Sequence, residues 1–209
     1  MHARWVMVII GVMTAVLPWT AAAEQMSVTP LGAQLPSLER SHISVPATLL
    51  AQLARTYATP EAIATFLHRS FTFTRDMETF GQADHWQTPE EFAARRAGDC
   101  EDYAMLAREL LRRNGIEADV FSLFGQQGYA HTVCVFKDQR GRYNVLDQDT
   151  LRSYHAASLE EVASALHPAW TFGGIAEQQG TRGRLVQRLT NAHPAAALDF
   201  SSPVANFQF

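Results

Sequence analysis

The hydrophobic period of the sequence changes midway along the chain, and this change constrains the fold more than any other feature. Residues 100–113 carry small and apolar side chains at helical spacing, and Asn114-Gly115, a common helix end, follows them. Three later segments instead alternate apolar and polar side chains as strands do, with turn-like residues between them: 118–124, 129–136 and 142–147. A helix followed by an antiparallel meander predicts one α+β domain in which this central helix packs on the sheet.

Helix-start signals indicate further helices around this core. Thr59-Pro60 and Thr88-Pro89 each place a capping residue before a proline, and Glu91 completes a capping box at the second site. We expect Gly98 to end the helix that begins there, whereas the chain after Phe172 shows no clear period and is predicted to be irregular. In addition to the central helix, the sequence predicts helices at residues 46–57, 59–73, 88–98 and 158–167.

The composition is that of one globular domain. Hydrophobic residues make up 47% of the 209 residues and charged residues 18%, which is enough apolar material for a single core. The formal net charge is -4 and no basic stripe is present, which argues against nucleic acid as a partner.

The first 23 residues have the three-part plan of a secretory signal peptide. Arg4 precedes an apolar run, and Ala21 and Ala23 occupy the small-residue positions before a cleavage site. The alternative is a membrane anchor, but the apolar run is short for a span, and no later stretch is long and apolar enough to cross a bilayer. We therefore expect cleavage after Ala23 and a periplasmic or secreted mature chain.

Cys100 lies at the start of the central helix, directly after Asp99, which is placed to cap it. A thiol at this position feels the positive end of the helix dipole, which favours the thiolate. A cysteine nucleophile also needs a base and a group that orients the base. His131 lies within a predicted strand and Asp147 ends the next one, so pairing of these strands can bring the two side chains together.

These residues carry a resemblance to a known group of enzymes. The strings GDCEDYA, AHTVCVF and YNVLDQ resemble the transglutaminase-like superfamily. The longer pattern that begins W-x-x-P-E-E-F is similar to the bacterial transglutaminase-like cysteine proteinases, which include periplasmic, calcium-dependent enzymes that cleave adhesins. The resemblance extends from Trp86 to Asp147 and implies a papain-like core, with the cysteine helix on an antiparallel sheet.

The resemblance also implies roles for individual residues. Cys100 would be the nucleophile, His131 the general base and acid, and Asp147 the group that orients the histidine, with the Cys100 backbone N–H in the oxyanion hole. The expected reaction is hydrolysis of a peptide or amide bond in an exported protein or peptide, through a thioester. The resulting division of the chain is a signal peptide (1–23), an extended lead-in (24–45), a transglutaminase-like catalytic domain (46–175) and an irregular C-terminal segment (176–209).

Three carboxylates surround the candidate nucleophile: Asp99, Glu101 and Asp102. Negative charges close to a thiol disfavour its thiolate form. Either they cap the helix and complement its dipole, or they hold a cation. The resemblance implies calcium at Asp99 and Glu101, with Asp102 a further candidate, and no organic cofactor.

Other interpretations of the two cysteines and of the fold stay open. In an oxidising compartment Cys134 could form a disulfide with Cys100, but strand alternation places Cys134 and His131 on opposite faces. If His131 faces Cys100, Cys134 is expected to face away. A non-hydrolytic accessory or binding protein, or a cross-linking transglutaminase, could use the same fold.

Overall fold

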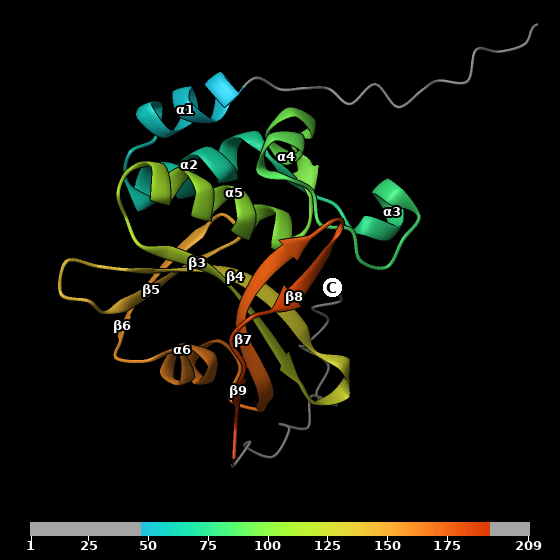
Figure 1. Ribbon diagram of the computed structural model, residues 1–209, viewed down its shortest axis with the longest axis vertical. Coiled ribbons are helices and arrows are strands. Elements are labelled where there is room, and N and C mark those ends of the chain that lie inside the picture. The colour runs from blue at the N-terminus through green and yellow to red at the C-terminus, as the bar shows by residue number, and fades with distance from the viewer. Residues whose placement is uncertain (1–46, 193–209) are drawn as a thin grey trace, which may run out of the picture. The chain divides into compact units, whose positions relative to one another are not determined.

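The fold is an antiparallel sheet with helices on both of its faces (Figure 1). The computed structural model describes residues 47–192, so the predicted signal peptide (1–23) and lead-in (24–45) lie outside the described residues. The strands of the main sheet are β3 (Ala118–Gly125), β4 (Ala130–Lys137), β5 (Tyr143–Asp147), β6 (Thr150–Ala156), β7 (Trp170–Gln179), β8 (Arg182–Leu185) and β9 (Leu189–Thr190). Their order is β6-β5-β4-β3-β7-β8, and β9 also pairs with β7.

Most helices cover one face of this sheet, and one covers the other (Figure 1). The helices are α1 (Ala47–Thr56), α2 (Pro60–Ser70), α3 (Asp76–Phe80), α4 (Pro89–Arg95), α5 (Cys100–Arg113) and α6 (Leu159–Leu166). A short parallel pair, β1 (Thr72–Phe73) and β2 (Ala97–Gly98), lies between the helices of the first group. The arrangement is the α+β class that the sequence predicts, with the cysteine helix packed on the antiparallel meander β3-β4-β5.

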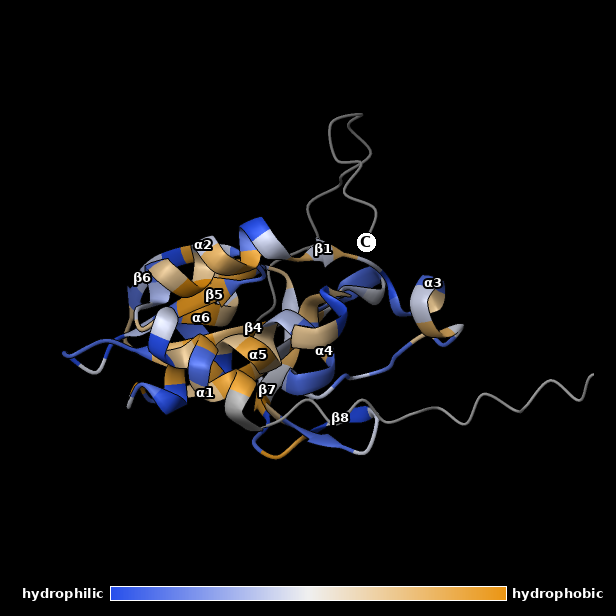
Figure 2. Cartoon of the chain, turned by 90° about the horizontal axis from the view of Figure 1, so that it is seen from above, coloured by the Kyte–Doolittle hydropathy of each residue, from blue (hydrophilic) through white to orange (hydrophobic). Residues whose placement is uncertain are grey.

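Small residues let α5 approach the sheet closely. Ala104 and Ala107 are fully buried in the core that α5 forms with β3 and β4. Cys134 of β4 belongs to the same core, whereas Val133 and Val135 point to the opposite face, toward α6. The two faces of the sheet therefore have separate cores, and the colours of Figure 2 show that α5 carries many hydrophobic residues.

The helix starts follow the capping signals in the sequence. The Thr59 side chain accepts a hydrogen bond from the backbone of Ala62, and Thr88 and Glu91 form the predicted capping box. The predicted end of α4 at Gly98 is wrong, since the helix ends at Arg95 and Gly98 lies in β2. A side chain at Gly98 would overlap with the Asp102 carboxylate, so the glycine is required by packing rather than by a helix end.

The predicted irregular segment at 176–209 is wrong for its first part, because the sheet continues through β7, β8 and β9 to Thr190. β8 is exposed at most of its positions and therefore lacks the apolar alternation that marks a half-buried strand. Within β7, Gly174 has a φ of 157° and packs against the backbone of Gln187. β6 and α3 were not predicted from the sequence. Residues 193–209 lie outside the described part of the chain.

No helix in the described range 47–192 combines the length and the apolar character that a membrane span requires.

Candidate active site

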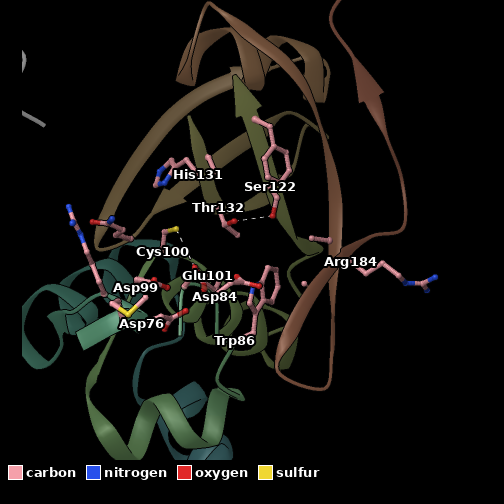
Figure 3. Close-up of a pocket in the computed structure, with 18 of the residues that line it drawn as sticks. Asp76, Asp84, Trp86, Asp99, Cys100, Glu101, Ser122, His131, Thr132 and Arg184 are labelled. Carbon is pink, nitrogen blue, oxygen red and sulfur yellow. Dashed lines mark hydrogen bonds between the residues drawn. The ribbon is translucent and has the colours of Figure 1, made fainter. Parts of the chain in front are cut away.

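A cleft of about 580 Å³ opens where the start of α5 meets β4 and the outer strands β7 and β8 (Figure 3). Cys100 and His131 both line it. Ser122 and Thr132 add a buried polar wall and share a hydrogen bond of 2.9 Å between their hydroxyl groups. The cleft thus brings together residues from the helix and from the sheet that are well separated in the sequence.

His131 is held by a carboxylate at one end of its ring. Its Nε2 atom lies 2.8 Å from Asp147 Oδ1, and the two side chains are only 10% and 13% exposed. The second oxygen of Asp147 accepts a hydrogen bond of 2.8 Å from Arg152 Nε. Burial raises the pKa of Asp147, but the hydrogen bonds and charges of His131 and Arg152 outweigh burial and hold this pKa below its ordinary value. Asp147 is therefore a charged acceptor fixed from two sides.

The contact of Arg152 with the site was not predicted from the sequence. Arg152 belongs to β6, a strand whose polar composition gives no clear alternation. The pairing of β4 with β5, in contrast, follows from the meander, and it places His131 and Asp147 near one another as expected.

Cys100 is the first residue of α5, and its sulfur lies against β4. The backbone N–H of Thr132 contacts the sulfur and favours its ionised form. The thiol donates a hydrogen bond of 3.4 Å to Glu101 Oε2. Burial, followed by the charges of Glu101 and Asp99, raises the pKa of Cys100 well above its ordinary value. Burial and the neighbouring acidic residues therefore favour the protonated thiol, against the Thr132 N–H that favours the thiolate.

Asp102 connects α5 to the loop before α4. It is fully buried, and its oxygens accept hydrogen bonds from the backbone N–H and the side-chain amide of Gln87, at 2.8 and 2.6 Å, and from the Asp99 backbone at 3.3 Å. Burial raises its pKa to about 7, although the Gln87 hydrogen bonds oppose this shift. Both oxygens thus have protein donors, which gives Asp102 a structural role whether or not it also contacts a cation.

The acidic cluster is larger than the sequence indicates. Oxygen atoms of Asp76, Asp84 and Glu101 lie within 4.8 Å of one another, and Asp76 also forms such a group with Asp99 and Asp102. Asp76 and Asp84 come from α3 and the loop that follows it, a segment with no recognisable motif, so sequence reasoning missed them. Figure 3 shows Asp76, Asp84, Asp99 and Glu101 gathered near Cys100.

Two features show that this cluster suits a cation. The Oδ1 atoms of Asp76 and Asp99 are buried and have no hydrogen-bond partner among the described residues. Burial and neighbouring carboxylates raise the pKa of Asp76 to about 6 and that of Glu101 to about 10. An all-oxygen set of carboxylates is the donor set that Ca²⁺ prefers.

Both cysteines are free. Cys134 is fully buried and faces α5, so the expectation that it would face away from the cysteine helix is wrong. The alternation itself is as predicted, but the face shared by Thr132 and Cys134 is the one that α5 covers. Cys134 is a small buried core residue.

One of three comparisons with known proteins, the family profile, agrees with the motifs. The sequence profile of the bacterial transglutaminase-like cysteine proteinases (BTLCP) matches residues 43–159, which is more than half of the chain. The calcium-bound structure of LapG from Legionella pneumophila is 19% identical over 68% of this chain and 74% of that chain, with a TM-score of 0.40. The EGTA-treated structure of LapG is 16% identical over 64% and 89%, also with a TM-score of 0.40. A search of curated proteins found no match.

Proposed function

The chain belongs to the family of bacterial transglutaminase-like cysteine proteinases, and from this premise we propose that it is an exported, calcium-dependent peptidase with Cys100, His131 and Asp147 as its catalytic triad. The observation that carries the proposal is the 2.8 Å contact between His131 and Asp147 in a cleft that also holds Cys100 at a helix start. A nucleophile, a base and a group that orients the base are the minimum set for covalent acyl transfer.

The proposed mechanism gives each nitrogen of His131 its own role. Because Nε2 of His131 is engaged by Asp147, the nitrogen that would accept the Cys100 proton is Nδ1. The sulfur then attacks the carbonyl carbon of the substrate, and His131 returns the proton to the leaving amine as the C–N bond breaks. Water, deprotonated by His131, next breaks the thioester C–S bond and restores the thiol. The Cys100 backbone N–H at the start of α5 stabilises the oxyanion in both steps.

The acidic cluster supports the calcium requirement. We assign Asp76, Asp84, Asp99 and Glu101 as the residues that would hold the ion. Their oxygens converge, and two of these atoms, Oδ1 of Asp76 and Oδ1 of Asp99, have no hydrogen-bond partner within residues 47–192. A bound Ca²⁺ supplies positive charge to carboxylates that otherwise oppose thiolate formation. Export rests on the predicted signal peptide at 1–23.

Alkylation of Cys100 by iodoacetamide tests the triad, since the buried Cys134 is protected in the folded chain. We expect fast labelling at or below pH 7 in Ca²⁺ and slower labelling in EGTA. In His131→Ala the rate should fall at least about tenfold. The control His68→Ala changes a 74% exposed histidine that does not line the cleft and should label like the wild type.

Two results would contradict the proposal. Labelling that requires prior reduction would indicate a disulfide between the cysteines. A rate equal to that of a free thiol in both the wild type and His131→Ala would favour a non-hydrolytic accessory protein. If the triad is confirmed, a peptide substrate incubated with a primary amine distinguishes hydrolysis from cross-linking, because only the latter incorporates the amine.

A further inference from the structure

β8 forms an edge of the main sheet next to the cleft. Among residues 47–192 its one strand neighbour is β7, so one row of its backbone N–H and C=O groups points away from the sheet. Gly183, Arg184 and Leu185 all line the cleft that contains Cys100. Because the side chains of a strand alternate between faces, three successive lining residues indicate that the backbone of β8 itself borders the cleft.

Trp86 holds this edge in place. The indole ring lies against Gly183 so closely that a Cβ atom there would overlap with it. The Trp86 backbone N–H donates to the carbonyl of Thr181 at 3.0 Å, and the Gln178 side chain donates to the Trp86 carbonyl at 2.8 Å. β8 is therefore fixed by Trp86, which lines the same cleft, while the edge of β8 that faces away from β7 has no strand neighbour among residues 47–192.

The same edge is basic, although the chain as a whole is acidic. Residues 170–192 contain three arginines and one glutamate, against a net charge of -4 for the chain. Arg182 and Arg184 are exposed, and no ion pair to either is found within the described residues. Glu177 is the cross-strand neighbour of Arg184, and Arg188 lies over the Phe172 ring at 4.6 Å.

Arg182 and Arg184 are two residues apart and so project from the same face of β8. Figure 3 shows the Arg184 side chain directed away from the cavity. A strand added to this edge would follow the cleft wall with its backbone and place every second side chain opposite the arginines. Opposite charges across neighbouring strands stabilise the pairing, and an open edge accepts an extended peptide through main-chain hydrogen bonds.

From this arrangement we infer that the edge of β8 binds an extended acidic segment of the protein substrate as an added strand, with carboxylates at alternate positions paired to Arg182 and Arg184. The inference rests on the proposed peptidase function, since it identifies the bound segment as the substrate that continues past Cys100. It also selects a substrate class: chains with acidic, strand-forming residues on one side of the cleaved bond.

Binding of designed peptides tests this inference without cleavage. The full chain with Cys100→Ala is titrated, in Ca²⁺, into three fluorescein-labelled peptides with four repeats of Glu-Thr, Gln-Thr or Lys-Thr. We expect the Glu-Thr peptide to bind at least about tenfold more tightly than the Gln-Thr peptide at low salt, with a smaller difference at high salt. Arg182→Gln/Arg184→Gln should abolish the preference, and the matched control Arg69→Gln/Arg140→Gln, which changes two exposed arginines outside the cleft, should keep it.

A charge-reversal variant distinguishes a loss of specific charge pairing from a loss of folding. Arg182→Glu/Arg184→Glu should prefer the Lys-Thr peptide over the Glu-Thr peptide, which a damaged protein would not do. Strand addition is tested with two isomers of the Glu-Thr peptide, methylated on the backbone nitrogens of the glutamates or of the threonines. Because alternate N–H groups of a strand face opposite sides, only one isomer should lose binding.

The inference is overturned if the acidic and neutral peptides bind equally, if the control double variant loses as much affinity as Arg182→Gln/Arg184→Gln, or if both methylated isomers bind like the parent peptide. Its failure is distinguishable from failure of the proposed function. If the wild type cleaves peptides but shows no acidic preference, only the proposed binding at β8 is rejected. If acidic peptides bind preferentially but no peptide is cleaved, the peptidase function is rejected and the binding site at β8 is kept.

Discussion

Arg152 shows how much a single residue outside the cleft contributes to the arrangement of the candidate triad. Its guanidinium holds the oxygen of Asp147 that His131 does not use. In Arg152→Gln, Asp147 should lose this fixed orientation, and we expect kcat for peptide cleavage to fall roughly 10- to 100-fold with a smaller change in KM. In a plot of kcat against pH, the acidic limb should also shift to higher pH as the pKa of Asp147 rises. Arg152→Lys should restore part of the lost kcat and part of the shift in the acidic limb.

Arg140→Gln is the control for this change, because Arg140 is an exposed arginine in the turn between β4 and β5. Equal activity and equal pH profiles for Arg152→Gln and the wild type would show that Asp147 needs no second partner.

Asp102 and Asp84 allow structural and metal-binding roles to be separated. Asp102→Ala would leave the buried donors of Gln87 without acceptors, and we expect it to lower the free energy of unfolding by about 3 kcal/mol or more. Asp84 is exposed, so Asp84→Asn should barely change stability while weakening calcium affinity. Urea unfolding and calcium titration of both variants check this. An Asp84→Asn protein with unchanged calcium affinity would remove Asp84 from the ligand set.

The sequence predicts residues with a motif and misses residues that chain folding brings in from elsewhere. Cys100 follows from its place at a helix start, and the strand contexts of His131 and Asp147 predict that they meet, which the structure supports. Asp76, by contrast, joins the acidic cluster through a short helix that lacks a distinctive pattern. Its position depends on packing, which no local signal in the sequence encodes.

At the scale of the element, the contact between β8 and Trp86 leads to a prediction for Gly183. In Gly183→Ala the new methyl group would overlap with the indole, so either the strand or the ring must move. We expect a loss of about 1–3 kcal/mol in unfolding free energy, together with a changed indole fluorescence. Trp86→Phe in the same chain should recover part of the loss, because the smaller ring leaves room for the methyl group.

Thr181→Ala serves as the control for Gly183→Ala, since it changes an exposed side chain in the turn next to β8. Full stability of Gly183→Ala would mean that Trp86 does not hold this strand.

The predictability of the elements depends on how they are buried. α2 and α4 carry capping residues, and their starts follow from the sequence. The strands of the meander are buried on both faces or on one, and their apolar pattern reveals them. β8 has too few buried side chains to show a pattern, so its pairing with β7 is evident only in the folded chain.

For the whole molecule, the buried acids predict an unusual dependence of stability on pH. In metal-free protein, burial and neighbouring charge raise the pKa to about 6 for Asp76, about 7 for Asp102 and about 10 for Glu101, against ordinary values near 4. At these three positions the folded state keeps protons that the unfolded chain releases, so their contribution to stability is fully present below about pH 4 and is lost as the pH rises through the raised values.

Calcium should reverse this trend, because the ion requires the ionised carboxylates and competes with protons for them. We expect the thermal midpoint in EGTA to fall between pH 5 and pH 8, whereas the gain in midpoint on adding Ca²⁺ should grow over the same range. Glu101→Gln should flatten the curve in EGTA. A midpoint in EGTA that rises with pH would show that these acids are ionised without the metal.

The pairing of β3 with both β4 and β7 determines how much of the chain must be available before the cleft can form. β3 lies between a strand that follows it directly and one that comes much later in the chain. A nascent or partly translocated chain that stops before β7 has the cysteine, the histidine and the aspartate, yet one wall of its cleft does not exist. For the exported protease proposed above, we therefore expect no activity until β7 and β8 have left the translocation channel and can complete the cleft.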